Sequence, residues 1–146
     1  MNDNKGKYDW TIFFLHHNGK TCSYKPNYKD VIGFYKFFAE NKVDVVLNGH
    51  THTYEYLKPY AEDGNVDLSK KNETSYKDLK NRFVSVTIGT GGKINKKWNA
   101  NPNNQENCDD GSIVAYAEHV SSFGLFSIEG KTLSFEGVNS YTGIPF

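Results

Sequence analysis

The chain has 146 residues, which is enough for about one domain with a hydrophobic core of its own. Its 17 basic and 17 acidic residues cancel, so the net charge predicts no nucleic-acid partner and no membrane-surface partner. No run of about 18 apolar residues occurs, so we expect no membrane span, and the first residues lack the apolar core of a signal peptide.

The first predicted elements are a strand, a helix and a second strand. Residues 10–15 are rich in β-branched and aromatic side chains, which is typical of a strand. A helix is expected from Asn27, its predicted N-cap, through about Asn41, although Gly33 weakens that prediction slightly. The apolar run at 43–47 predicts a buried strand. Because a βαβ unit of this length is parallel by default, both strands should end at the same edge of a sheet.

Histidines follow both of these strands. His16 follows the first, and the sequence Asn48-Gly49-His50-Thr51-His52 follows the second. Neutral imidazole is a common ligand of zinc and iron, and open α/β sheets bind ligands beyond the carboxyl ends of their strands. The position therefore favours a metal site over histidines that only bond to backbone carbonyls.

His17 is the neighbour of His16 in the chain. Adjacent side chains project in different directions, so we expect at most one of these two to face the same crevice as His50. His17 could contact a metal ligand or the substrate, or it could be a solvated side chain.

Three further strands are predicted by their apolar and β-branched residues. Residues 83–88 alternate in hydrophobicity, and the strands at 123–128 and 132–138 flank a tight turn that contains Gly130. The second and third of these strands should therefore form an antiparallel hairpin.

Two polar stretches, at 60–82 and about 93–111, are predicted to be loops. The run Gly89-Thr90-Gly91-Gly92 ends the strand before the second loop, and it lacks the Lys-Ser/Thr pair of a nucleotide-binding loop. We expect it to form a backbone turn near the crevice. Cys22 and Cys108 could pair or remain free thiols, because their spacing fits neither a zinc finger nor a dense disulfide scaffold.

The order of these motifs resembles the C-terminal half of the purple acid phosphatases, which are calcineurin-like metallophosphoesterases. The match runs from the strand before His16 to Gly-His-x-His-x-Tyr-Glu at 49–55, and then to the Gly-Gly turn and the closing hairpin. It covers nearly the whole chain. The resemblance implies an α/β fold over residues 1–146: the C-terminal half of a two-sheet αββα sandwich, with a βαβ unit and further, partly antiparallel strands in one partial domain.

The resemblance also implies roles for individual residues. His16 and His50 would bind a divalent zinc, manganese or iron ion, and His52 would bind a ferric ion of the same dinuclear centre. His17 and Tyr54 are possible contacts around that centre. The implied activity is acid phosphatase-like hydrolysis of phosphate monoesters, with a small phosphate ester or a phosphoprotein as substrate. Secretion or a lysosome-like compartment is implied for many members.

The chain departs from the family pattern in one major respect. The family's centre also uses two aspartates, a tyrosine and an asparagine from motifs upstream of the first strand, and residues 1–9 are too few to carry them. We therefore expect an incomplete centre, a missing N-terminal half of the same domain as partner, and little activity for the chain alone. The alternatives are a non-catalytic metal- or phosphate-binding module derived from that family, and a structural domain whose histidines only form hydrogen bonds.

Overall fold

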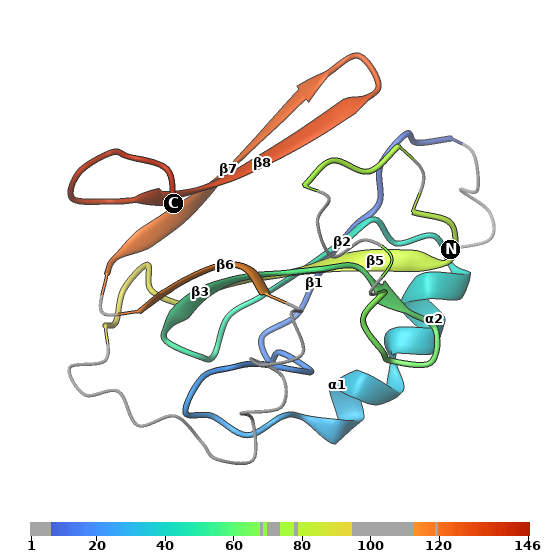
Figure 1. The fold of residues 1–146 in the computed structure, drawn as a ribbon, viewed down its shortest axis with the longest axis horizontal. Helices are drawn as coiled ribbons and strands as arrows, with labels where there is room; N and C mark the ends of the chain where they lie inside the picture. Colours follow the sequence, from blue (N-terminus) through green and yellow to red (C-terminus); the bar gives the residue numbers. More distant parts are fainter. Residues whose placement is uncertain (1–6, 68, 70–73, 78, 95–112, 119) are drawn as a thin grey trace.

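A computed structural model describes residues 7–67, 69, 74–77, 79–94, 113–118 and 120–146, without the side chains of 113–118 (Figure 1). The described residues form eight strands and two short helices in the following order: β1 (Ile12–Phe14), α1 (Lys29–Gly33), α2 (Tyr35–Glu40), β2 (Val45–Asn48), β3 (Thr53–Leu57), β4 (Tyr60–Ala61), β5 (Arg82–Ile88), β6 (Ile113–Glu118), β7 (Ser122–Glu129) and β8 (Thr132–Asn139).

The main sheet has the strand order β1-β2-β5-β3-β6, with β4 paired to β5. Strands β1, β2 and β5 are parallel, with Ile12 opposite Val45 and Val45 opposite Val84. Strand β3 is antiparallel to both β5 and β6. The predicted parallel pairing of the first two strands is confirmed, so the segments that follow β1 and β2 leave the sheet at one edge.

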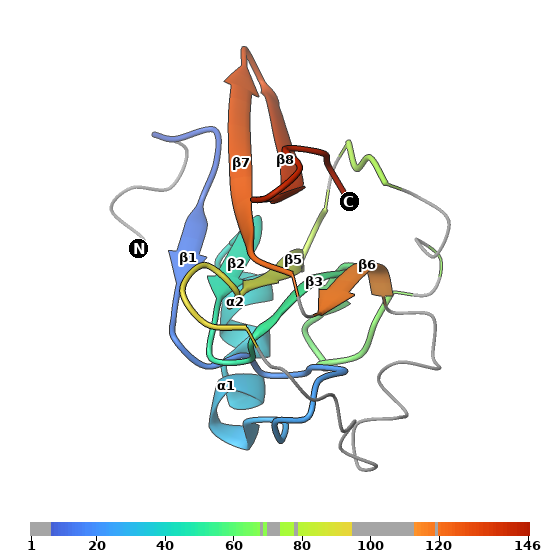
Figure 2. The same ribbon diagram turned by 90° about the vertical axis from the view of Figure 1, so that its left-hand side faces the viewer.

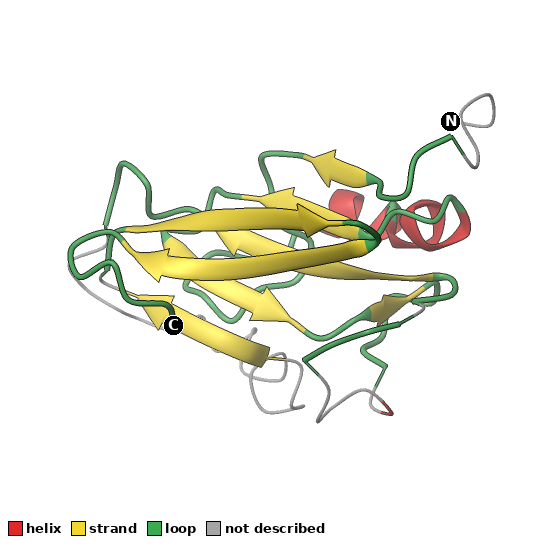
Figure 3. Cartoon of the chain, turned by 90° about the horizontal axis from the view of Figure 1, so that it is seen from above, coloured by secondary structure: helices red, strands yellow, loops and turns green. Residues whose placement is uncertain are grey.

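The sheet carries helices on one face and a hairpin on the other (Figures 1 and 2). On the helix side, a core of large apolar side chains joins α2 to the sheet: Tyr35, Phe38, Val43, Val46, Leu57, Tyr60 and Phe83. On the other side, β7 and β8 pack through Phe126, Leu133 and Phe135 onto Val45, Tyr54, Val84 and Val86. Seen from above, the hairpin runs along the sheet as a separate two-stranded layer (Figure 3). This layering agrees with the predicted α/β class.

The single helix predicted for 27–41 is wrong in two respects. It is divided into α1 and α2 at Phe34, whose N–H bonds to the carbonyl of Val31 three residues back. Gly33 at this point lowers helix propensity, which is consistent with the break. Asn27 is not the N-cap: Tyr28 holds that position without a side-chain bond, and Asn27 Oδ1 accepts a hydrogen bond from the Thr21 amide instead.

The other strand predictions are confirmed in part. The strand at 83–88 and the hairpin are confirmed as β5 and as β7–β8, with Gly130 at a φ of 58° in the turn. The first strand is shorter than predicted, because only Ile12–Phe14 pairs in register with β2. Strands β3, β4 and β6 were not predicted, and β4 occupies the first two residues of the segment at 60–82 that was expected to be a loop. Most of the predicted loop at 93–111 lies outside the described residues.

Two further observations concern composition. Cys22 is buried and disulfide-bonded, while Cys108, the other cysteine, lies outside the described residues. Among the helices that the structure describes, none has the length and apolar character needed to cross a membrane.

Candidate metal centre

The parallel strands β1 and β2 bring two histidine segments to one edge of the main sheet. His16 follows β1, and its carbonyl accepts a hydrogen bond of 3.0 Å from the Gly49 amide just beyond β2. This bond continues the strand pairing by one step past the end of the sheet. The two segments are therefore held side by side at the carboxyl ends of the strands.

A tight turn then separates His50 from His52. The Thr51 amide bonds to the Gly49 carbonyl at 2.7 Å, and His50 has a φ of 63°, in the left-handed region that non-glycine residues rarely adopt. Gly89, at the end of β5, packs so closely on this turn that a Cβ there would collide with the Thr51 carbonyl. The glycine run predicted to form a turn near the crevice does contact the histidine turn.

Three histidines form one cluster at this edge. His16, His17 and His50 each offer a nitrogen, and these atoms all lie within 4.8 Å of one another. His50 Nδ1 is 3.2 Å from His16 Nε2. The prediction that at most one of His16 and His17 faces His50 is wrong. The chain bends at His16 and His17, so both rings lie beside His50, with centroid separations of 5.2 and 4.5 Å.

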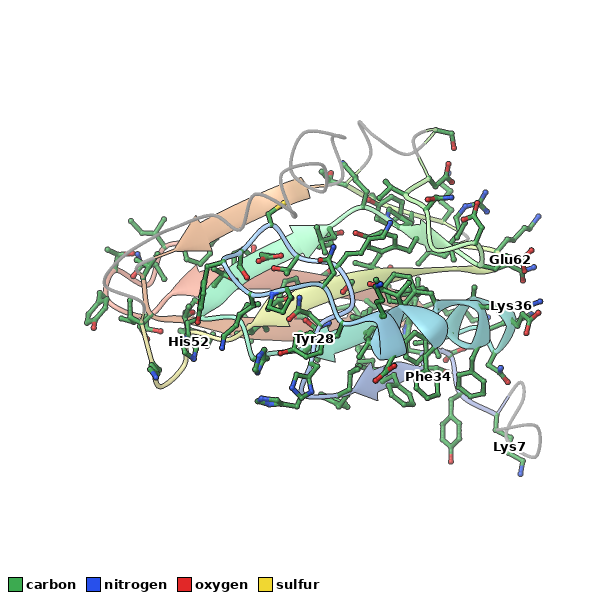
Figure 4. All side chains as sticks on the ribbon, turned by 90° about the horizontal axis from the view of Figure 1, so that it is seen from below. Lys7, Tyr28, Phe34, Lys36, His52 and Glu62 are labelled. Carbon is green, nitrogen blue, oxygen red and sulfur yellow. The ribbon has the colours of Figure 1, made fainter. Side chains whose placement is uncertain are left out.

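His52 lies outside this cluster. Its Nδ1 is 3.1 Å from the Tyr24 hydroxyl, and Figure 4 shows its side chain apart from Tyr28 along the same edge. The structure thus brings His16 and His50 together as expected and places His52 beyond the turn, with its own aromatic neighbour. Its predicted role as a ligand of a second ion stays a prediction.

Two tyrosines that the sequence analysis missed contact these histidines. Both belong to the segment between β1 and α1, here called the tyrosine loop (residues 18–28). The Tyr28 hydroxyl is 2.7 Å from His50 Nε2, and Tyr24 contacts His52 as described above. A phenol bonded to one imidazole nitrogen fixes the orientation of the ring and leaves the other nitrogen for a ligand. The only sequence signal was two tyrosines four residues apart.

A buried carboxylate anchors the tyrosine loop. Glu55 on β3 has no exposed surface, and its oxygens accept hydrogen bonds from Thr21 Oγ1 at 2.6 Å, Thr53 Oγ1 at 2.9 Å and the Cys22 amide at 3.3 Å. Burial raises the pKa of Glu55, and the three hydrogen bonds partly offset that increase. Glu55 is part of the Gly-His-x-His-x-Tyr-Glu motif, but the hydrogen bonds described for it join it to Thr21 and Cys22 of the loop and to Thr53, and none joins it to a histidine.

Tyr54, the other motif residue considered for the site, points to the opposite face of β3. Its ring stacks on Phe146 and Phe135, with centroids 4.8 and 6.4 Å away. Burial raises its pKa to about 12. These contacts assign Tyr54 to the packing between the sheet and the hairpin, and no contact that the structure describes joins it to the histidine cluster.

The surroundings of His50 favour its neutral form. Partial burial lowers the pKa of His50, and the positive charges of His17, Lys25, His16 and His52 lower it further. A neutral imidazole carries the lone pair that a metal needs. The donor set of the cluster, three imidazoles and no carboxylate among the described residues, fits a borderline divalent cation such as zinc better than a ferric ion.

Comparison with known proteins shows similarity to metallophosphoesterases. A family model described as calcineurin-like phosphoesterase matches residues 1–54. Purple acid phosphatase 5 of Arabidopsis thaliana is 29% identical over 132 residues, covering 88% of this chain and 32% of that protein. Purple acid phosphatase 19 of the same plant is 32% identical over 94 residues, covering 62% of this chain and 24% of that protein.

Two solved structures share the fold. Purple acid phosphatase PPD1 from yellow lupin (Lupinus luteus) seeds aligns with 97% of this chain and 24% of its own, at a TM-score of 0.61 and 20% identity. GAP50, described as the anchor in the inner membrane complex of Plasmodium, aligns with 93% of this chain and 34% of its own, at a TM-score of 0.63 and 13% identity.

Over residues 1–54 the chain is similar to the calcineurin-like phosphoesterases, which are a family of metal-dependent hydrolases. Within that family the sequence similarity is to purple acid phosphatases. The chain spans between about a quarter and a third of the length of these two curated relatives.

Proposed function

We propose that this chain contributes the histidine side of a metal centre that hydrolyses phosphate monoesters. The observation that carries the proposal is the approach of His50 Nδ1 to His16 Nε2, 3.2 Å apart at the carboxyl ends of parallel strands. The similarity to purple acid phosphatases supports the same reaction class. Small phosphate esters or phosphoproteins are the proposed substrates.

The residues that would hold the metals are His16 and His50 for a divalent zinc, manganese or iron ion, and His52 for a ferric ion. Bound ions of this kind neutralise phosphoryl oxygens and acidify a bound water. The chain's own part is to orient the imidazoles: Tyr28 bonds to His50 and Tyr24 bonds to His52, so one nitrogen of each ring remains for a ligand. Lys25, whose positive charge acts on His50, adds attraction for an anionic substrate.

The proposal includes a partner, the other half of the same catalytic domain. The described cluster consists of imidazoles alone, and a centre that retains a ferric ion needs anionic ligands. Carboxylates supplied by the rest of the domain would complete it. We therefore propose that the isolated chain hydrolyses phosphate esters very slowly, if at all.

A binding experiment tests the function without requiring turnover. Inorganic phosphate is titrated into the zinc-loaded chain and followed by calorimetry, with the His50→Ala variant as control. We expect phosphate to bind to the parent chain and not to the variant. If the zinc-loaded parent binds no phosphate, the proposed function is wrong. Turnover of p-nitrophenyl phosphate by the chain alone, abolished by His50→Ala, would contradict the proposed inactivity.

A non-catalytic module is the second candidate. It is favoured by the all-imidazole cluster and by the shared fold with a protein described as an anchor. The genomic DNA upstream of the first codon separates the two candidates. In-frame Gly-Asp-x-x-Tyr and Gly-Asn-His motifs there would support an enzyme, and a genuine start signal would support the module.

A further inference from the structure

The histidine cluster contains a residue that neither the motif nor the proposed dinuclear centre uses, namely His17. It directly follows His16, and only the bend at these two residues brings its ring beside His50. His17 is half-buried in this position. Its ring therefore lies beside two proposed metal ligands, although the proposed dinuclear centre gives it no role.

We propose that His16, His17 and His50 bind one divalent cation of the zinc type through three imidazole nitrogens, with Tyr28 as the residue that positions His50 and His17. The proposal rests on the metal dependence within the proposed function, but it does not depend on catalysis. It differs from the arrangement implied by the family resemblance, in which His17 binds no metal.

The distances support a shared ion. Two nitrogens bound tetrahedrally to one zinc, each at about 2.0–2.1 Å, lie about 3.3–3.4 Å apart. His16 Nε2 and His50 Nδ1 are 3.2 Å apart. The nitrogen of His17 lies within 4.8 Å of both, so a modest rotation of its half-buried ring completes the set. Three imidazoles and an open fourth position form a recurrent zinc environment.

Tyr28 holds the cluster in this arrangement. Its hydroxyl is 2.7 Å from His50 Nε2, which leaves His50 Nδ1 directed at His16. Its ring packs against the ring of His17 with centroids 4.3 Å apart. One side chain thus supports two of the three proposed ligands. Tyr28 is itself fixed by the bond from its amide to the Gly19 carbonyl at 2.9 Å.

His52 provides a matched control within the same segment. It lies two residues from His50, carries the same side chain and is bonded to Tyr24, but it does not belong to the cluster. Removing His52 should therefore leave a three-imidazole site intact. In a centre of the type implied by the family resemblance, His52 would be a ligand and His17 would not.

The test measures zinc affinity by competition with a chromophoric chelator, and the coordination by cobalt(II) absorption. The proteins are the parent chain, His16→Ala, His17→Ala, His17→Gln, His52→Ala and Tyr28→Phe. We expect one zinc per parent chain, bound about 100-fold more weakly in His16→Ala and in both His17 variants. The zinc affinity of Tyr28→Phe should be about 10–100-fold lower than that of the parent, which is the usual effect of removing a residue that orients a metal-bound histidine. The zinc affinity of His52→Ala should stay within about threefold of that of the parent.

Circular dichroism and thermal melting show which variants are folded, and His17→Gln replaces His17→Ala if the latter is not. The cobalt spectrum of the parent should be that of a tetrahedral site and should change in the His17 variants. Folded His17 variants that bind zinc as tightly as the parent would overturn the proposal. So would a His52→Ala variant as weak as His16→Ala. Zinc binding through His17 without phosphate binding would instead contradict the proposed function alone.

Discussion

The histidine edge of the main sheet and the β7–β8 hairpin are both attached to β3, but by different interactions. At the histidine edge, fully buried polar side chains form the attachment: Asn18, Thr21, Ser23, Thr51, Thr53 and Glu55. At the hairpin, aromatic rings form the attachment: the ring centroid of Phe135 lies 6.4 Å from that of Tyr54 and 6.1 Å from that of Tyr56. Alternate residues of a single strand serve the two attachments, since Glu55 faces the loop and Tyr54 the hairpin.

This difference shows what each attachment can do. Hydrogen bonds are directional, so a network of them fixes where the tyrosine loop places Tyr24 and Tyr28. Apolar packing contributes burial energy in proportion to area and specifies position less sharply. We therefore expect the polar attachment mainly to fix the positions of side chains at the histidine edge, and the apolar attachment mainly to contribute to the free energy of unfolding. Three substitutions test this comparison.

The largest effect is expected at Gly89. A methyl group there collides with the backbone carbonyl of Thr51, which cannot move without shifting the histidine turn. Gly89→Ala should lower the free energy of unfolding by about 3 kcal/mol, near the upper end of overpacking effects, and should abolish zinc binding. Chemical denaturation and zinc titration measure both. Gly92→Ala is the control, because a Cβ at Gly92 meets no atom within 4 Å. Parent-like zinc affinity in Gly89→Ala would contradict the link between β5 and the site.

A similar substitution in the hairpin should separate stability from metal binding. A Cβ on Gly137 of β8 would collide with the ring of Tyr54, a side chain that can move more easily than backbone. Gly137→Ala should cost about 1–3 kcal/mol of unfolding free energy. Its zinc affinity should stay within about threefold of the parent. If zinc binding falls together with stability here, the two attachments are not independent.

The smallest expected effect is a pH dependence due to Glu55. Its pKa in the folded chain is raised above the ordinary 4.5, so between that value and the raised one the folded chain holds a proton that the unfolded chain has lost. The contribution of Glu55 to the free energy of unfolding is therefore fully present below about pH 4.5, and it declines as the pH rises. Relative to Glu55→Gln, the parent should therefore gain stability as the pH is lowered from 8 to 5.

Urea denaturation at several pH values measures this difference for Glu55→Gln. Glu136→Gln replaces an exposed carboxylate of β8 and serves as the control, with no comparable change expected. If the parent instead loses stability on acidification relative to Glu55→Gln, the carboxylate is stabilised by its hydrogen bonds more than it is destabilised by burial.

The sequence predicted those parts of the fold that local patterns determine. The parallel pair β1–β2, strand β5 and the hairpin follow from runs of β-branched and aromatic residues and from the tight turn at Gly130. Strand β3 was not predicted, because its Thr53 and Glu55 are typical of a solvent-facing side although both are fully buried. Their burial is possible only because a loop distant in sequence supplies partners, and no local pattern records this.

The candidate site was predicted to a similar extent. His16 and His50 were placed together by the parallel βαβ geometry, which a sequence can indicate. His17 was expected to face elsewhere, since a regular backbone would send it there, and the bend that turns it inward has no sequence signature. Tyr24 and Tyr28 were missed because their approach depends on how the tyrosine loop folds back over the histidine turn.

The left-handed backbone of His50 has an energetic cost. A non-glycine residue at a φ of 63° costs on the order of 1–3 kcal/mol, and a glycine would adopt the same turn with little strain. Glycine, however, has no imidazole. The histidine at this position carries backbone strain that glycine would avoid, while glycine would remove the hydrogen bond to Tyr28. We therefore expect His50→Gly to keep the turn and to lose the ring nitrogens that the proposed cation site needs.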